Sequence, residues 1–495
     1  MMRRASALAL LLPFVTAAAA QPAQLPFEPV QSALFAIPGT LANAWADYDR
    51  DGDLDLALVG QSGAVSLYRN DRGSFVSVGE ALGLPLSGPE MRSASWGDYD
   101  GDGWPDLLVG PTDKDHSSRL FRNVGGRRFA DVTAETGLAI PGRSARHTNW
   151  IDFDNDGDVD LYATDRAGEN RLYRNDGGRF ALVPSDRAPA DMRPTVGACW
   201  LDYDRDGDLD LFTANQAGAT DGLWRNDGDR FVDVAAVLGM DNAGRTKDEG
   251  GVGCAVGDFD NDGYLDLFVP NYGRNALYRG GPGGSFANVA AQAGVGVDNH
   301  AVGAAFGDYD NDGWADLMVT SYVRSGSDLQ PRDALFRNGG GAFVDLLANG
   351  GIVNVADHGV QWVDYDRDGA LDLSLTDSFG KEGGHILFRN TMPGDAARRS
   401  LSVLVLDARG RYTRAGAEVR LYDAAGGILG TRQVETAGGY SSQSMGPVHF
   451  GLKASDPVTV EVSFMAKGGR RTVKVAGVRP QAYAGRSLVV RQPAR

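Results

Sequence analysis

Aspartates recur at a fixed spacing in one short stretch of the chain. Residues 47–56 read DYDRDGDLDL, with aspartate at positions 1, 3, 5 and 9 and glycine at position 6. The glycine permits a sharp turn, so carboxylates at alternate positions can converge on one point. Hard oxygen ligands in a flexible loop suit Ca²⁺, and position 7 would add its backbone carbonyl. The stretch therefore predicts a calcium loop.

The same spacing occurs seven times, with first aspartates 50 to 56 residues apart. Up to seven structural Ca²⁺ ions are expected. Position 7 varies among Asp, Trp, Tyr and Ala, as expected where only its carbonyl contributes. The predicted ligands, copy by copy, are Asp47, Asp49, Asp51, Asp53 and Asp55; Asp98, Asp100, Asp102, Trp104 and Asp106; Asp152, Asp154, Asp156, Asp158 and Asp160; Asp202, Asp204, Asp206, Asp208 and Asp210; Asp258, Asp260, Asp262, Tyr264 and Asp266; Asp308, Asp310, Asp312, Trp314 and Asp316; and Asp364, Asp366, Asp368, Ala370 and Asp372.

Two other interpretations of these loops are weaker. An EF-hand needs Glu at position 12 and flanking helices, whereas position 12 is Leu58 and strand-like residues flank the loop. Asp and Gly are also ordinary turn formers. That explains one or two aspartates per loop, but not four at fixed positions in every copy.

The charge balance fits metal loops and excludes some partners. The formal net charge is −17, which argues against nucleic acid and anionic membrane as partners. Four aspartates in each of seven loops account for 28 of the 65 acidic residues, and 48 Lys and Arg outnumber the remaining 37. The rest of the chain is thus net basic, and the acidity is concentrated where a cation would lie.

A second motif lies between the aspartate copies. It reads Leu-aromatic-Arg-Asn, as in LYRN (67–70), followed in the first six copies by a Gly-rich turn and Phe. This is typical of a β-hairpin. Each unit of about 50 residues then contains four short strands, as a propeller blade does. The fold class predicted is all-β, a seven-bladed β-propeller with calcium loops followed by a small β-sandwich. The last unit lacks its Phe strand, and residues 27–30 (FEPV) are expected to supply it and close the ring.

The chain divides into four predicted segments. Residues 1–20 have two arginines, a short apolar run and small residues, as in a signal peptide cleaved after about Ala20. The propeller is expected over 21–391, a linker over 392–399 and a β domain over 400–495. A secreted protein without membrane insertion is therefore expected, either periplasmic or extracellular.

These motifs resemble a known family. The DxDxDGxxDL loops with LYRN and the Phe strand look like FG-GAP or VCBS-type repeats, which form calcium-binding propellers. GAEVRLYD (416–423), TAGGYSSQS (436–444) and VHFGL (448–452) resemble the ASPIC/UnbV domain. The pairing resembles bacterial secreted relatives of cartilage acidic protein. The resemblance implies an extracellular binding module. One copy departs from the pattern, with Gly280 in place of the usual Asn, which puts its hairpin turn in doubt.

The ligand site is expected on the face opposite the calcium loops. That face carries the longer connections 110–118, 240–251, 321–333 and 378–385, and variable loops on a rigid scaffold usually carry recognition. The leading hypothesis is a binding or adhesion module for a protein or carbohydrate. The GGY of 438–440 and the HFG of 449–451 are interpreted as packing and turn positions, or alternatively as a ligand site.

The alternative function is a polysaccharide-acting lyase or hydrolase with a site at the channel mouth. No GxSxG, HExxH or P-loop occurs, so no enzyme is predicted. His147, His300 and His358 precede their aspartate motifs and would lie near that mouth, as ordinary hydrogen-bonded residues or as part of a site. Convergence of one of them with a Tyr, Arg or Lys in one pocket would favour an enzyme. Cys199 and Cys254 occupy similar positions in neighbouring units, and their pairing is left open.

Overall fold

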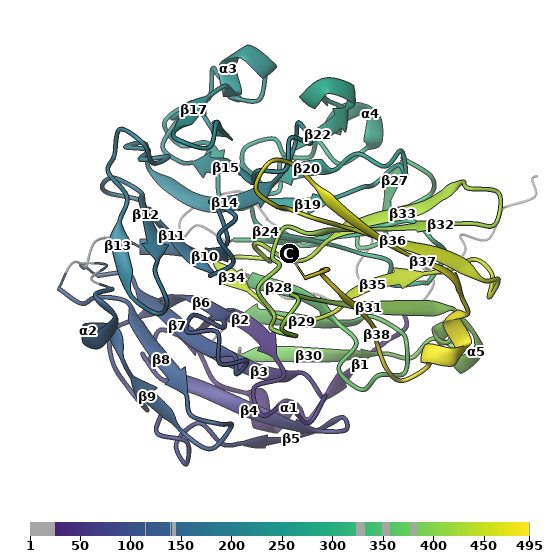
Figure 1. Ribbon diagram of the computed structural model, residues 1–495, viewed down its shortest axis with the longest axis horizontal. Helices are drawn as coiled ribbons and strands as arrows, with labels where there is room; N and C mark the ends of the chain where they lie inside the picture. Colours follow the sequence, from purple (N-terminus) through teal and green to yellow (C-terminus); the bar gives the residue numbers. More distant parts are fainter. Residues whose placement is uncertain are drawn as a thin grey trace, which may run out of the picture.

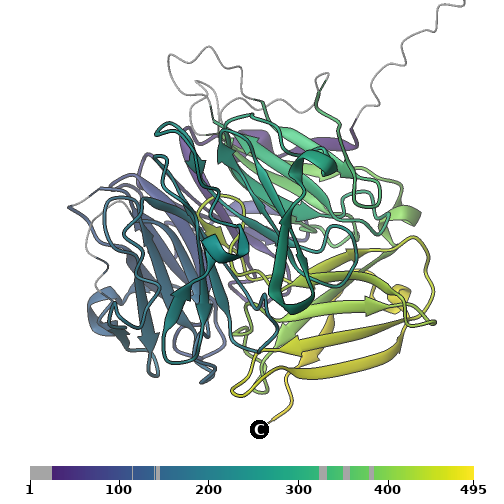
Figure 2. The same ribbon diagram turned by 90° about the horizontal axis from the view of Figure 1, so that it is seen from above.

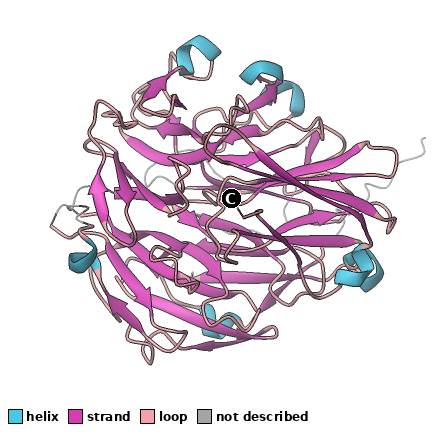
Figure 3. Ribbon diagram, in the orientation of Figure 1, coloured by secondary structure: helices cyan, strands magenta, loops and turns pink. Residues whose placement is uncertain are grey.

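A computed structural model describes residues 25–113, 115–138, 140, 145–322, 332–348, 357–377 and 384–494 (Figure 1). The predicted signal peptide lies outside the described residues. Strands dominate (Figure 3), and the helices are single turns. The helical turns are α1 (Ser32–Phe35), α2 (Thr133–Thr136), α3 (Ala235–Leu238), α4 (Ala290–Ala293), α5 (Gly394–Ala397), η1 (Pro282–Gly284) and η2 (Pro480–Tyr483). No helix among the described residues is long and apolar enough to cross a membrane.

Residues 27–390 form antiparallel sheets of four ring strands each, seven of them in the described part of the chain. Each runs from an inner to an outer strand. The first four sheets are β2 (Thr40–Ala46), β3 (Asp55–Gly60), β4 (Val65–Asp71) and β5 (Ser74–Ser77); β6 (Met91–Gly97), β7 (Asp106–Pro111), β8 (Arg119–Asn123) and β9 (Phe129–Asp131); β10 (Ala145–Ile151), β11 (Asp160–Asp165), β12 (Arg171–Asn175) and β13 (Phe180–Leu182); and β14 (Thr195–Leu201), β15 (Asp210–Asn215), β16 (Gly222–Asn226) and β17 (Phe231–Asp233).

The other three sheets follow the same order. They are β19 (Ala255–Gly257), β20 (Asp266–Val269), β22 (Ala276–Gly281) and β23 (Ser285–Asn288); β24 (Ala301–Gly307), β25 (Asp316–Ser321), β26 (Ala334–Asn338) and β27 (Phe343–Asp345); and β28 (Asp357–Val363), β29 (Asp372–Asp377), β30 (His385–Asn390) and β1 (Phe27–Val30). A small ladder joins β18 (Gly250–Gly251) to β21 (Asn271–Tyr272). The inner strands β2, β6, β10, β14, β19, β24 and β28 contact one another in sequence around a closed ring, so the architecture is that of a β-propeller.

Aromatic residues stand two positions before six of the seven loops and fasten neighbouring blades. Trp96 and Trp150 are almost fully buried between sheets. The Trp96 indole donates to Ala44 O of the preceding inner strand at 3.2 Å, and the Trp150 indole donates to Ser95 O at 3.4 Å. In these two residues one side chain thus provides both a large buried apolar area and an indole N–H with a partner.

The ring closes through the N-terminal strand, as predicted. β1 pairs antiparallel with β30, with Phe27 opposite Asn390 and Val30 opposite Leu387. The exchanged strand completes the last sheet and removes an unpaired edge.

The two cysteines form a disulfide between adjacent blades. Cys199 lies in β14 and Cys254 directly precedes β19, with Cα atoms 6.1 Å apart. The sequence left this pairing open. The bond links two inner strands that are not paired by a β-ladder.

The C-terminal residues form two sheets around a common core. The sheets are β35 (Val448–Gly451), β31 (Ser400–Leu406) and β38 (Leu488–Arg491), and β33 (Ile428–Gln433), β32 (Glu418–Tyr422), β36 (Val458–Phe464) and β37 (Arg471–Val478). Alternating side chains such as Val403 and Val462 are buried between them. Figure 2 shows these strands against one face of the ring. The predicted linker contains α5.

One C-terminal segment leaves this sandwich and enters the ring (Figure 2). We call residues 436–445 the channel segment. It includes β34 (Ser442–Gln443), which pairs in parallel with Ala94 and Ser95 of β6 as a fifth strand. Isolated bridges join Gly439 to Ala304 and Met445 to Ala46 on other inner strands. The sequence pattern had suggested packing or turn positions here, and the segment does pack, but inside the propeller rather than within its own domain.

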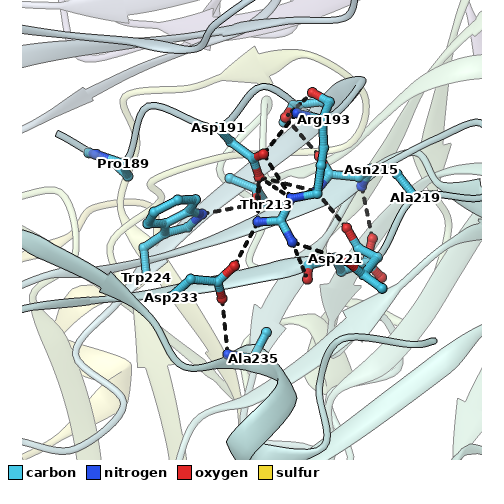
Figure 4. A network of polar contacts seen from close by, with 12 residues as sticks. Pro189, Asp191, Arg193, Thr213, Asn215, Ala219, Asp221, Trp224, Asp233 and Ala235 are labelled. Atoms are coloured by element: carbon cyan, nitrogen blue, oxygen red, sulfur yellow. Dashed lines mark hydrogen bonds and ion pairs between the residues drawn. The ribbon is translucent and has the colours of Figure 1, made fainter. Parts of the chain in front are cut away.

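A buried polar network stabilises the fourth blade (Figure 4). The Arg193 guanidinium pairs with both Asp191 and Asp233, each at 2.7 Å, and Arg245 pairs with fully buried Asp221 at 2.9 Å. Asn215 donates to Asp191 Oδ2 at 3.2 Å. Its charges are paired, so the network joins the incoming connection to the blade rather than forming an open site.

Candidate metal loops and channel

All seven aspartate loops have the same backbone conformation. The position-4 residue is left-handed in every copy, with φ between 54° and 67°, and the position-6 glycine has φ between 89° and 108°. Arg50 and Gly52 are the first such pair. Side chains other than glycine rarely adopt these angles. The loops therefore share a turn that the glycine at position 6 permits.

The first aspartate of each loop presents one oxygen inward. Its Oδ2 accepts the N–H of the position-6 glycine, as in Gly52 to Asp47 at 3.0 Å. The other oxygen, Oδ1, is buried without a hydrogen-bond partner in Asp47, Asp98, Asp202 and Asp364. A buried, unpartnered carboxylate oxygen is costly unless a cation takes up its charge. The donor set therefore fits a hard cation.

Further carboxylates lie beside this oxygen. Asp47, Asp49 and Asp55 each offer an oxygen within 4.8 Å of the others, and equivalent groups occur in the other loops. The N–H of the position-7 residue donates to the aspartate at position 5, as Asp53 N–H does to Asp51 at 2.8 Å. Side chains at position 7 bond elsewhere, since Asp53 pairs with Arg367 at 2.9 Å. This arrangement is compatible with a ligand role for the position-7 carbonyl alone.

The aspartate at position 9 joins the loop to the hairpin of the same blade. Asp55 is fully buried and accepts the N–H groups of Tyr48 at 3.0 Å and Asn70 at 2.8 Å. Every copy repeats this pair of bonds. The ninth carboxylate thus has a structural role besides the predicted ligand role.

The asparagine of the Leu-aromatic-Arg-Asn motif links neighbouring blades. Asn123 donates to Tyr48 O of the preceding blade at 2.8 Å and to Pro105 O at 3.0 Å, and it accepts the Gly126 N–H at 2.8 Å. Gly280 cannot make these bonds. Its hairpin nevertheless forms, with η1 as the turn between β22 and β23, so the doubt about that turn was wrong.

Replacing Asn123 by alanine should destabilise the protein by about 2–3 kcal/mol, because two buried carbonyls and one N–H lose their partner. Chemical unfolding measures the change. Gln292→Ala is the matched control, since this amide is exposed in α4. Equal stability of the two variants would show that the asparagine does not couple the blades.

The motif arginine partly neutralises the loops. In four copies this arginine pairs with the aspartates at positions 3 and 5 of the loop, as Arg122 does with Asp100 at 2.7 Å and Asp102 at 3.0 Å. In the three copies that read Arg-Asn-Asp, the arginine pairs instead with that last aspartate, as Arg69 does with Asp71 at 2.9 Å. The following residue therefore decides which carboxylates the arginine contacts.

Burial raises the pKa of the first and ninth aspartates, as three of them show. It raises the pKa of Asp364 to about 8, with the charges of Asp368 and Asp366 adding to the effect. The pKa of Asp47 rises to about 6 and that of Asp55 to about 9, again mainly through burial. Groups that resist ionisation while aimed at one point are typical of a site completed by a cation.

A belt of contacts joins successive loops, and sequence reasoning missed it. The position-4 side chain reaches the next loop, as Asn155 does by donating to Gly207 O at 3.2 Å and Asn311 to Gly369 O at 3.0 Å. The second loop has Gly101 at this position. Arg411 of the C-terminal sandwich takes its place and donates to Gly157 O at 3.2 Å. The variation among Arg, Asn and Gly at position 4 was the sequence feature that could have indicated these contacts between loops.

The C-terminal sandwich covers the loop face with further basic groups. Arg414 pairs with Asp152 Oδ2 at 2.8 Å, and Arg470 pairs with Asp202 Oδ2 at 2.6 Å. Both are first-position aspartates, and the same Oδ2 also accepts the N–H of the position-6 glycine. A cavity of about 660 Å³ between ring and sandwich is lined by residues including Arg432, Glu435 and Tyr412.

The channel segment is bonded to the inner strands. Gln443 accepts the Trp150 N–H at 2.6 Å and donates to Trp150 O at 2.9 Å. His147, predicted near the channel, has Nε2 3.1 Å from Ser442 O, and burial lowers its pKa to about 4. His147 thus holds the segment as an ordinary hydrogen-bonded residue.

The other two histidines lie with tyrosines at the mouth opposite the loops. The rings of His300 and Tyr272 stack at 3.8 Å, and His358 contacts Tyr440 edge-on at 4.9 Å. Arg92 and Arg146 act electrostatically on Tyr440. Histidine, tyrosine and arginine therefore lie together at this mouth, and whether they share one pocket stays untested. Of the connections expected to carry recognition, 240–251 is described, and parts of the other three lie outside the described residues.

The FG-GAP-like repeat family matches residues 47–109, 98–163, 152–213, 202–269 and 258–319, more than half of the chain. The chain belongs to the FG-GAP-like repeat family. The ASPIC and UnbV family matches residues 410–481 of this repeat protein. Cartilage acidic protein 1 of Mus musculus is 29% identical over 161 residues, which are 30% of this chain and 24% of that relative. The match thus spans about a quarter of the relative's length.

Solved structures with a similar fold are distant in sequence. An Agrocybe aegerita lectin that recognises non-reducing terminal N-acetylglucosamine is 17% identical, with 74% of this chain and 92% of the lectin covered and a TM-score of 0.39. BBS1N in complex with ARL6DN is 11% identical over 74% of this chain and 98% of that one, with a TM-score of 0.48. A Bacillus licheniformis rhamnogalacturonan lyase is 12% identical over 74% and 76%, with a TM-score of 0.40.

Proposed function

We propose that this FG-GAP repeat protein is a secreted, calcium-stabilised binding module for a protein or carbohydrate ligand. The carrying observation is the repeated loop itself, in four copies of which the first aspartate presents a buried oxygen without a hydrogen-bond partner. Calcium is the ion of choice because every donor is an oxygen and the loops are acidic and flexible. The residues that would hold it are those at positions 1, 3, 5 and 9, with the carbonyl of position 7.

The loop carboxylates have structural tasks, which supports a scaffold role for the metal. They accept N–H groups of their own turn, and the loops are tied to hairpins, to neighbouring loops and to the sandwich. The sandwich covers the loop side of the ring, which supports a ligand site on the opposite face.

The stability of the metal-free protein should fall as the pH rises, whereas the stability of the calcium-bound protein should not. The folded pKa values of Asp47, Asp308 and Asp364 are about 6, 7 and 8, above the unfolded value of about 3.9. Their protonated forms therefore stabilise the fold below about pH 4, and this contribution is lost as the pH rises through about 6 to 8. In EGTA the unfolding midpoint should fall between pH 5 and pH 8, whereas with saturating Ca²⁺ it should not. Parallel pH curves in both buffers would contradict the metal interpretation.

The binding function is tested with purified polysaccharides and proteins as ligands. Affinity electrophoresis of the mature protein in gels containing neutral or acidic polysaccharides should show retardation with Ca²⁺. A protein ligand would be detected by the same comparison with candidate extracellular proteins. No retardation and no complex with any of these would overturn the proposal.

The second candidate is a polysaccharide lyase or hydrolase at the channel mouth. It is favoured by the meeting of His358, Tyr440 and Arg92 near one point. Incubation with acidic polysaccharides would reveal new reducing ends or an unsaturated product. Activity that Tyr440→Phe abolishes would replace the binding module by an enzyme.

A further inference from the structure

At the mouth opposite the aspartate loops, the channel segment presents Tyr440 to a group of arginines. Arg92 and Arg146 lie at the starts of the inner strands β6 and β10, and Arg166 directly follows β11. Tyr440 is buried, and its ring contacts His358 at 4.9 Å. The mouth is therefore built jointly by the ring and the C-terminal sandwich.

Positive charge at this mouth exceeds the negative charge that is paired with it. Glu90 pairs with Arg92 at 2.6 Å. Neither Arg146 nor Arg166 forms an ion pair among the described residues. In a protein of net charge −17, such a surplus of arginine in one place is a local positive field.

Arg146 is the buried member of this group. It is only 8% exposed, and its Nη1 is buried without a hydrogen-bond partner. Burying a guanidinium without an acceptor is costly, so an anion at this point would repay that cost. Arg166 is exposed and Arg92 is half-buried, so solvent reaches the group.

The same positive charges act on the hydroxyl of Tyr440. Burial opposes ionisation of its hydroxyl, yet the positive charges of Arg146 and Arg92 outweigh burial and lower its pKa. An anionic group beside this hydroxyl would meet both a donor and the arginine charges.

Aromatic rings border the arginines. Tyr272 and His300 stack at 3.8 Å with 4° between their planes, and Tyr322 lies 6.1 Å from His300 at 28°. Tyr272 and Tyr322 are half-buried. The rings hold one another in place, so they form a preformed surface with apolar faces and polar tips.

We propose that this mouth binds an acidic saccharide. Its carboxylate would be held by Arg146, Arg166 and the Tyr440 hydroxyl, and its sugar ring would lie against Tyr272 and Tyr322. A planar guanidinium matches a carboxylate in a bidentate manner. A sugar ring suits the aromatic border, because it has apolar faces that pack on rings and hydroxyls that reach their polar tips. The inference rests on the proposed binding function and names its ligand class.

The test is isothermal titration of the mature protein in Ca²⁺ with oligogalacturonate. Neutral galactose oligomers and polyglutamate are the comparison probes. Arg146→Gln and Arg166→Gln should each weaken oligogalacturonate binding roughly tenfold or more. Arg230→Gln is the matched control, since Arg230 is exposed on a hairpin of the fourth blade. Unfolding midpoints verify that each variant is folded, and exposed Arg166 keeps the test valid if Arg146→Gln fails to fold.

Each outcome has one meaning. Binding of oligogalacturonate that the two mouth variants weaken and Arg230→Gln does not would support the inference. Equal binding by the neutral oligomer, or tighter binding of polyglutamate, would overturn the ligand class. Binding that the mouth variants leave unchanged would overturn the site while the binding function stands. No binding of any probe would overturn the inference, and the polysaccharide and protein panel then decides the proposed function separately.

Discussion

Removing calcium should lower the unfolding midpoint of the mature protein by roughly 10 °C or more, because several sites each contribute binding free energy to the folded state alone. Without ions, the buried oxygens of Asp47, Asp98, Asp202 and Asp364 lack partners, and the carboxylates of each loop repel one another. Thermal unfolding with excess Ca²⁺ and with EGTA measures the shift. Counting bound metal on the same sample should give several Ca²⁺ per chain.

The control for this shift is Mg²⁺ in place of Ca²⁺. Mg²⁺ demands a tighter octahedral site and dehydrates reluctantly, so it should restore little of the midpoint. An unchanged midpoint in EGTA together with no bound metal would reduce the aspartates to turn residues.

Replacing Gln443 by alanine should cost about 2–4 kcal/mol, the largest effect expected from a single change in the channel segment. The side chain accepts the Trp150 N–H at 2.6 Å and donates to Trp150 O at 2.9 Å, both buried, and it donates to Glu435 O at 3.2 Å in a partly buried bond. Loss of the amide leaves buried backbone groups unpaired and loosens the sandwich from the ring. Urea unfolding followed by tryptophan fluorescence measures the change.

Gln492→Ala serves as the matched control, because Gln492 follows β38 and its side chain makes no hydrogen bond among the described residues. If Gln443→Ala unfolds at the same urea concentration as this control, the channel segment does not contribute to stability. If it unfolds in two steps, the sandwich and the ring have become independent.

The repeating part of the protein could be predicted from local sequence patterns. A loop such as 47–55 specifies its own turn through local residue types, and the hairpins and four-strand units follow from alternation and turn chemistry over a few residues. Even ring closure by Phe27–Val30 could be predicted, because a missing strand at one end matched a spare strand at the other. Local patterns repeated many times leave little freedom for another fold.

The roles of the non-repeating residues could be seen only in the folded protein. The channel segment has the sequence of an ordinary loop, yet it contacts inner strands that lie hundreds of residues away in the chain. Arg411 completes the belt of loop contacts at Gly101, and Tyr440 meets Arg92 and Arg146 at the mouth. Such contacts depend on the docking of one domain on another. No local spacing encodes them, because the contacting residues lie far apart in the sequence.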